Sequence, residues 1–133
     1  MAVSRIEVRT TSRVEMVDIT QRVHAAVRDT KVEAGLCVVY VPHTTAAVTI
    51  NEHADPDVAR DVVKALAGLV PHRGGYAHAE GNSDAHIKAA LMGNSRVVPV
   101  DGGAPLLGTW EGIFLCEFDG PRTRQVCIMV VGA

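Results

Sequence analysis

The order of short apolar runs along the chain is the feature that most limits its fold. Runs of strand length occur at 6–10, 14–19, 36–41 and 43–51, and they return over the last forty residues, with two longer helical patterns between them. Because strands and helices do not alternate strictly, the order argues against a doubly wound parallel sheet. It predicts an α+β fold: a compact single domain, mainly antiparallel β-sheets with two longer helices and one short helix.

Two segments carry the end signals of helices. Thr20 is the expected N-cap of the first helix, and Gly35 is its expected end. Asp55 followed by Pro56 predicts an N-cap and a first helical position for the second helix. Pro71 is expected to stop that second helix.

The size and composition of the chain fit one domain spanning 1–133. Hydrophobic residues make up 47% of the chain and aromatic residues only 4%, so the core must be built from Val, Ala, Leu and Ile. Such a core suits sheets covered by helices. The net charge of −2 gives no electrostatic case for nucleic acid or an anionic membrane, and neither partner is expected.

Three features predict a cytoplasmic protein. No apolar run approaches the roughly 20 residues that span a bilayer. The N-terminus lacks the apolar segment of a signal peptide. The cysteines are odd in number and lack metal-finger spacing, so we expect buried free thiols in a reducing compartment rather than a redox role. They are Cys37, Cys116 and Cys127.

Residues 43–51, HTTAAVTIN, alternate in the manner of a strand. One face becomes steadily more apolar and is expected to be core. The other face is polar and small, which leaves room for a ligand, with an exposed sheet face as the alternative. The core face holds Thr44, Ala46, Val48 and Ile50, and the second face holds His43, Thr45, Ala47, Thr49 and Asn51.

The periodic pattern is lost over residues 71–82, PHRGGYAHAEGN, which predicts a loop. Loops of this length are more often functional than not. Asn82 or Ser83 is then expected to cap the short helix, and Gly93 to close it.

Three histidines suggest a metal site. His43 heads the strand, His78 lies in the loop and His86 lies about one turn into the short helix. Three imidazoles can form an open tetrahedral site that leaves a position for water or substrate. Glu80 and Asn82 lie between two of them. The other histidines, His24, His53 and His72, are expected to be solvated surface residues.

The start of the short helix suggests a second chemistry, because free backbone N–H groups at a helix N-terminus favour anions. A phosphate could lie near Asn82, with Lys88 one turn into the helix. Arg122 and Arg124 are two residues apart and share a strand face, where guanidinium groups suit phosphate. Two arginines on a surface or edge strand are the alternative.

The only tryptophan lies in GTWEG, residues 108–112, where the flanking glycines allow a turn and the close approach of a ligand. Thr109 and Trp110 are therefore candidate substrate contacts. The alternative for Trp110 is a core plug. Glu117 and Asp119 continue the same strand, and solvent exposure is the simple expectation for both.

Four motifs in order, HTTAAVTINE, the DPD helix start, H-x-EGN-x-x-AHIK and GTWEG-I, resemble the YjbQ-like proteins, a secondary thiamine-phosphate synthase family. The resemblance runs from about Ser4 to the C-terminus. One departure is that Glu111 replaces the family's usual glutamine, which puts any amide-dependent contact at that position in doubt.

The resemblance implies a small α+β fold, a homotrimer, and an activity that joins a pyrimidine diphosphate to a thiazole phosphate. That activity can be secondary to another role of the family. The site residues that the resemblance implies are His43, Asn51, Glu52, His78, Glu80, His86 and Lys88.

One chain alone does not readily unite these residues. A strand rises about 3.3 Å per residue, which separates His43 and Asn51 by roughly 26 Å. A symmetric trimer could bring the two ends of this strand together from neighbouring chains. Alternatively, Asn51 and Glu52 brace the turn into the Asp55 helix.

Three functions are consistent with these residues. The first is a transferase on a small phosphorylated heterocycle, in which a divalent metal (Zn or Mg), or Lys88 with Arg124, stabilises a departing pyrophosphate. The second is a metal-dependent hydrolase, and the third is a trimeric metabolite-binding module. No Walker loop or dinucleotide fingerprint is present in the sequence, which argues against ATP or NAD. The candidate residues are Glu52, Glu80 and Lys88 for catalysis, Asn51, Asn82, Thr109, Trp110, Arg122 and Arg124 for substrate binding, and His43, His78 and His86 for metal.

Overall fold

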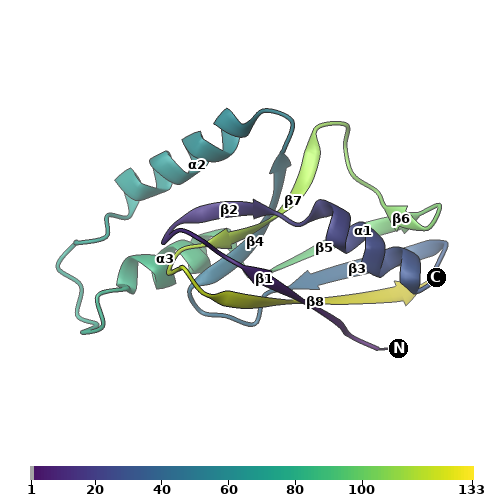
Figure 1. Cartoon of the computed structure of the whole chain (residues 1–133), viewed down its shortest axis with the longest axis horizontal. Coiled ribbons are helices and arrows are strands. Elements are labelled where there is room, and N and C mark those ends of the chain that lie inside the picture. Colours follow the sequence, from purple (N-terminus) through teal and green to yellow (C-terminus); the bar gives the residue numbers. More distant parts are fainter. Residues whose placement is uncertain (1) are drawn as a thin grey trace.

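The computed structural model describes residues 2–133, and it contains two antiparallel sheets and three helices. The larger sheet has the order β1 (Ser4–Arg9), β8 (Thr123–Gly132), β3 (Ala34–Tyr40), β5 (Ser95–Asp101) and β6 (Ala104–Pro105). The smaller sheet has the order β2 (Glu15–Asp18), β7 (Glu111–Glu117) and β4 (Ala46–Glu52). The helices are α1 (Thr20–Asp29), α2 (Pro56–Leu69) and α3 (Ser83–Met92). The predicted α+β fold is confirmed (Figure 1).

The main core lies between the two sheets and α1. It is built largely from valine and isoleucine, as the composition predicts, and every strand that contributes to it is paired antiparallel. A smaller cluster lies on the other side of β4 and β7, beneath α3. Its buried members are Ala47, Ala85, Ala89, Cys116 and Phe118.

The alternating segment 43–51 is covered on both of its faces. The strand begins at Ala46 rather than at His43. Ala46 and Val48 face the main core, as expected, whereas Ala47 is fully buried under α3. A small residue there lets the helix approach the strand closely, so the expectation of an open second face is wrong at Ala47.

The first helix differs from its prediction at both ends. Thr20 is its first helical residue, with Ile19 at the N-cap, and the helix ends at Asp29. Gly35 lies within β3, where an added Cβ would come within 2.0 Å of the carbonyl oxygen of Val131. That glycine permits the close approach of two strands and does not end a helix.

The ends of α2 and α3 are as predicted. The Asp55 carboxylate accepts a hydrogen bond from the Asp57 amide at 2.9 Å, and Pro56 is the first helical residue. Asn82 is the N-cap of α3 and Gly93 follows its last turn with φ at 90°.

The connections around these helices are irregular. Residues 71–82 form a loop held by a bond of 2.6 Å from the Tyr76 hydroxyl to the Pro71 carbonyl. Residues 106–110, expected to be part of a strand, form a turn before β7.

Apolar side chains are exposed on α2 and on one face of the larger sheet. α2 is amphipathic but has no buried residue, and Figure 1 shows it standing away from both sheets. The larger sheet has an apolar outer face, which we call the outer sheet face, where Leu36, Tyr40 and Val97 are 49%, 43% and 59% exposed. No helix within residues 2–133 has the length and apolarity needed to cross a membrane.

Candidate functional site

A buried ion pair organises the corner between β7 and β8. The Arg124 guanidinium donates through Nε to the Glu117 carboxylate at 2.9 Å, and both side chains are at most 2% exposed. Arg124 also donates to the Thr45 hydroxyl at 2.8 Å, and the Thr10 hydroxyl donates to Glu117 at 2.8 Å. Burial raises the pKa of Glu117, but these hydrogen bonds outweigh it and hold the pKa below its ordinary value.

This pair corrects two expectations from the sequence. Glu117 is buried and not exposed to solvent. Arg124 is also buried, so it is neither a surface residue nor available to bind a phosphate. Its guanidinium instead fixes Thr45, two residues after His43.

The orientation of His43 is set by the neighbouring strand. Its Nε2 accepts a hydrogen bond of 2.9 Å from the backbone N–H of Gln125. A neutral ring held in this way carries its proton on Nδ1. Burial lowers the pKa of His43, and the nearby charge of Arg124 lowers it further. The ring is therefore neutral near pH 7 and offers an N–H group.

In space, His86 lies between His43 and His78, and we call these three residues the histidine row. His43 and His86 line one hollow of about 390 Å³, together with Thr44 and Asn94. On its other side, the ring of His86 meets His78 edge-on, with the centroids 5.5 Å apart. Glu80 lies beyond, with its Oε2 3.8 Å from Nε2 of His78.

The histidine row is not assembled as a metal site within one chain. Over residues 2–133, no group of three His, Cys, Asp or Glu side chains is arranged to hold an ion. The Nε2 lone pair of His43 is already engaged by Gln125, and its Nδ1 carries a proton. A three-histidine metal site remains a prediction that requires His43 to leave Gln125 or a second copy to contribute.

The start of α3 is rich in carboxylates. Asn82 donates to Asp119 at 2.9 Å, and the same oxygen accepts from Arg122 at 3.2 Å. Asp84, in the first turn, is fully buried. Asp84 is paired with Arg13 and Lys88, and Asp119 with Arg122, and the anion site expected near Asn82 stays a prediction.

Lys88 lies on the buried face of α3 and is 2% exposed. Its Nζ lies 3.4 Å from Asp84, which also pairs with Arg13 at 3.0 Å, and 5.9 Å from the centroid of Phe118. Lys88 therefore stabilises the packing of α3 and, in this conformation, cannot touch a substrate. That outcome disagrees with the catalytic role expected from the sequence.

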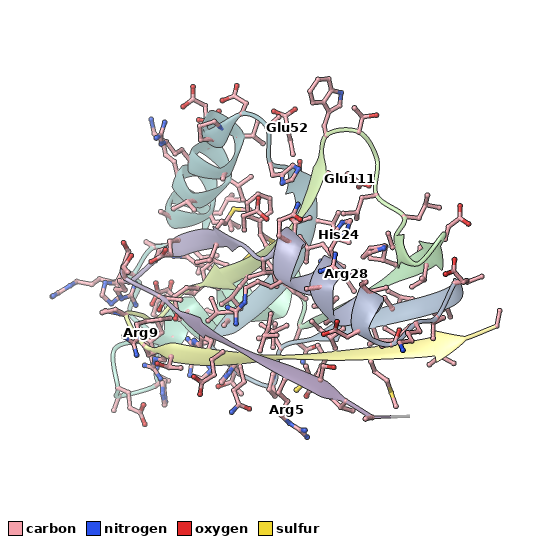
Figure 2. All side chains as sticks on the ribbon, turned by 45° about the vertical axis from the view of Figure 1, so that its right-hand side comes forward. Arg5, Arg9, His24, Arg28, Glu52 and Glu111 are labelled. Atoms are coloured by element: carbon pink, nitrogen blue, oxygen red, sulfur yellow. The ribbon has the colours of Figure 1, made fainter. Side chains whose placement is uncertain are left out.

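The remaining candidates lie at the far end of β4. Asn51 and Glu52 pair with Gly112 and Glu111 across the strands, and Figure 2 shows Glu52 and Glu111 close together. Asn51 accepts a hydrogen bond of 2.7 Å from the Glu52 amide, which is a local bracing contact. One chain therefore keeps these residues apart from the histidine row.

The GTWEG turn lies at the same end of the molecule. Thr109 is exposed, and Trp110 is 63% exposed, so its ring is not a core plug. Glu111 accepts a hydrogen bond of 2.7 Å from the Gly108 amide. Because this contact needs only an oxygen acceptor, glutamate can replace glutamine here without loss of the turn.

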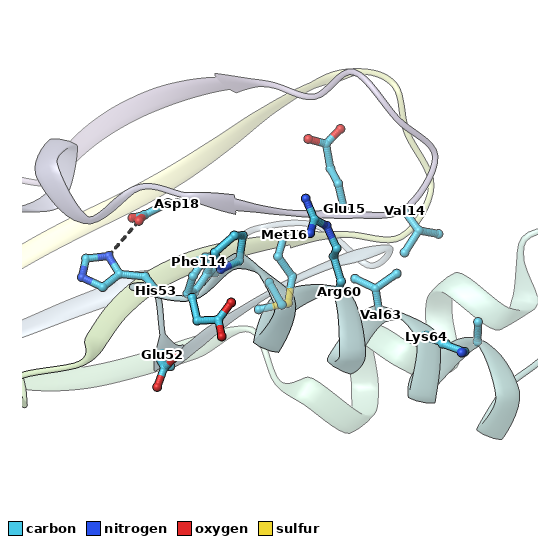
Figure 3. Close-up of a pocket in the computed structure, with 14 residues that line it drawn as sticks. Val14, Glu15, Met16, Asp18, Glu52, His53, Arg60, Val63, Lys64 and Phe114 are labelled. Carbon is cyan, nitrogen blue, oxygen red and sulfur yellow. Dashed lines mark hydrogen bonds and ion pairs between the residues drawn. The ribbon is translucent and has the colours of Figure 1, made fainter.

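Another hollow, which no pattern in the sequence indicated, lies between α2 and the smaller sheet. We call it the α2 groove; its volume is about 540 Å³ (Figure 3). At one end, Nδ1 of His53 lies 2.8 Å from the Asp18 carboxylate. His53 is exposed, as expected, but its ring is also paired with Asp18, and no local motif in the sequence links residues 18 and 53.

Residues 4–133 match the family model described as UPF0047 protein YjbQ-like. The chain belongs to the YjbQ-like family. Among its relatives, UPF0047 protein MJ1081 of Methanocaldococcus jannaschii is 48% identical over 128 residues, covering 96% of this chain and 93% of the relative. UPF0047 protein YugU of Bacillus subtilis is 45% identical, covering 96% and 97%.

Solved structures of YjbQ-like proteins share the fold. An uncharacterised family member from Clostridium acetobutylicum has 47% identity and a TM-score of 0.95, covering 96% of this chain and 99% of that one. A protein of unknown function from Sulfolobus solfataricus has 33% identity and a TM-score of 0.95, covering 99% and 97%. The names of these YjbQ-like proteins describe no activity.

Proposed function

We propose that this YjbQ-like chain is an enzyme of the thiamine-phosphate synthase type, acting on a small phosphorylated heterocycle. The observation that carries the proposal is the orientation of His43. A neutral imidazole with its N–H directed away from Gln125, close to Arg122 and Arg124, suits an anionic phosphate group.

In the proposed reaction, the thiazole nitrogen attacks the methylene carbon of the pyrimidine diphosphate. A carbon–nitrogen bond forms, the carbon–oxygen bond to the diphosphate breaks, and pyrophosphate leaves with both electrons of that bond. The N–H of His43 and the half-exposed guanidinium of Arg122 would stabilise the negative charge on the leaving oxygens. Glu80, next to His78, would orient the outer histidine.

A homotrimer fits this proposal. The outer sheet face exposes apolar side chains over β3 and β5, a surface that soluble monomers seldom leave open. In a trimer, Asn51, Glu52 and Trp110 of one copy could complete the histidine row of the next. A symmetric assembly would thereby unite residues that one chain separates.

The test is product formation by purified protein given the pyrimidine diphosphate and the thiazole phosphate. We expect His43→Gln to lower turnover by about 100-fold, because a well-placed donor contributes on that order. His24→Gln, on α1, is the matched control and should retain full turnover.

Other outcomes would contradict the proposal in distinct ways. Release of pyrophosphate or phosphate without joined product would indicate a hydrolase. Binding of both compounds with no turnover would indicate a metabolite-binding module. Equal turnover by the wild type and His43→Gln would remove His43 from the mechanism.

A further inference from the structure

The α2 groove has the size of a ligand site. Pockets for small molecules occupy about 300–1,000 Å³, and this groove measures about 540 Å³. Its walls are apolar, with Val63 of α2 facing Met16 and Phe114 of the smaller sheet. An amphipathic helix normally buries such residues, but none of the α2 residues is buried. The helix thus holds the groove open.

One end of the groove is built around His53. Its Nδ1 is fixed by Asp18 at 2.8 Å, and Asp18 is fixed in turn by the Thr20 amide at 2.9 Å. Gly112 makes room for the imidazole, since a Cβ there would lie 2.4 Å from the ring. The Asp18 carboxylate and the backbone at Gly112 therefore fix the position of the imidazole.

In the neutral form of His53, the outward ring nitrogen is an acceptor. When Nδ1 donates to Asp18, Nε2 carries a lone pair, and within residues 2–133 no group hydrogen-bonds to it. Figure 3 places Glu52 at the same end of the groove. This end therefore combines a lone pair with carboxylates, which favours N–H donors and positive charge and repels phosphate.

The cations of the groove lie along α2. Arg60 is paired with Asp57 at 2.7 Å, and Lys64 lies further along the helix. The acidic end is therefore not neutralised by either of them. The groove therefore has an apolar wall at Met16, Val63 and Phe114, and carboxylates gather at the end that holds Asp18, Glu52 and His53.

We propose that the α2 groove binds a small molecule that has an apolar ring or chain and a protonated amine, with the amine directed at His53 and Glu52. His43 lies between β3 and β4 and does not line this groove, so amine binding here does not depend on the proposed transferase activity. The His43→Gln variant should therefore leave amine binding in the groove intact.

The experiment is an NMR titration of ¹⁵N-labelled full-length protein with phenethylamine, and separately with phenylpropionate, which has a similar ring but the opposite charge. We expect saturable shifts of amides near Met16, His53, Val63 and Phe114 with the amine, and at least about tenfold weaker binding of the acid. No saturable shift up to about 10 mM amine, or equal binding of both probes, would overturn the proposal.

Matched variants on α2 locate the site. Ala59→Phe fills the groove and should abolish the shifts, whereas Ala65→Phe, on an exposed part of the same helix outside the groove, should leave them unchanged. His53→Phe should weaken amine binding by about tenfold and leave the acid unaffected. Shifts that follow protein concentration and not the amine would show that a second copy fills the groove, and would refute a small-molecule site.

Discussion

At the level of single residues, the Glu117–Arg124 pair is the contact whose disruption costs the most. Removing one partner of a buried ion pair leaves the other charge without compensation. The Arg124→Ala variant should lose about 3–5 kcal/mol of unfolding free energy, measured by urea denaturation. Arg122→Ala, at a half-exposed surface pair, is the control and should change stability by less than about 1 kcal/mol.

The same pair predicts how stability depends on pH. The pKa of Glu117 is lower in the folded protein than its ordinary value of 4.5, so the carboxylate stabilises the fold fully above that value. This contribution is lost as the pH falls from 4.5 through the folded pKa. The urea midpoint should therefore decline on acidification below about pH 4.5, and less steeply in Glu117→Gln. Identical pH profiles for both proteins would argue against the assignment.

The histidine row predicts weak metal retention. Because Nε2 of His43 is engaged by Gln125, only His78 and His86 of the row are available as metal ligands. A zinc site needs three or four protein ligands. We expect dialysed protein to contain well under one divalent ion per chain by elemental analysis. One ion per chain, lost in both His43→Gln and His86→Ala, would instead establish the three-histidine site.

At the level of elements, α2 is the helix that packs least. Local opening free energies are lowest where few apolar groups are buried. Amide exchange should therefore be faster in α2 than in α3 or β7, as followed by mass spectrometry. Protection of α2 equal to that of β7 would mean that another copy covers the helix.

Element boundaries were predictable where local chemistry decides them. The Asp55–Pro56 start of α2 and the Gly93 end of α3 depend on capping and backbone geometry, which neighbouring residues determine. Gly35 was misassigned because its role comes from Val131, almost a hundred positions away. β7 was hard to interpret because it is covered on both faces, so alternation gave no sign that Glu117 points inward.

The candidate site was less predictable than the fold. The sequence singled out His43, His78 and His86, and the structure does arrange them as neighbours around His86. It could not reveal that Gln125 engages His43, that Lys88 is buried, or that Asp18 pairs with His53. Each of these contacts joins distant segments through the tertiary fold, which no local pattern encodes.

For the whole molecule, the outer sheet face predicts assembly. Light scattering at micromolar concentration should give about three times 14.1 kDa. Val97→Lys should shift the protein toward monomers, because a charge in an apolar interface is costly. Leu69→Lys, on the exposed end of α2, is the control and should leave the mass unchanged. A monomeric wild type would also exclude a site shared between copies.

The antiparallel pairing of β1 with β8 has a consequence for chain connectivity. Ser4 lies opposite Ile128, and both chain ends emerge on the same side of the larger sheet (Figure 1). A short glycine-rich linker could join the two termini, and new ends could be opened in the loop at 71–82, which pairs with no strand. Such a circular permutant would keep every strand pair while α2 became the last helix and α3 the first. The fold is thus defined by its pairing pattern and does not depend on where the polypeptide begins.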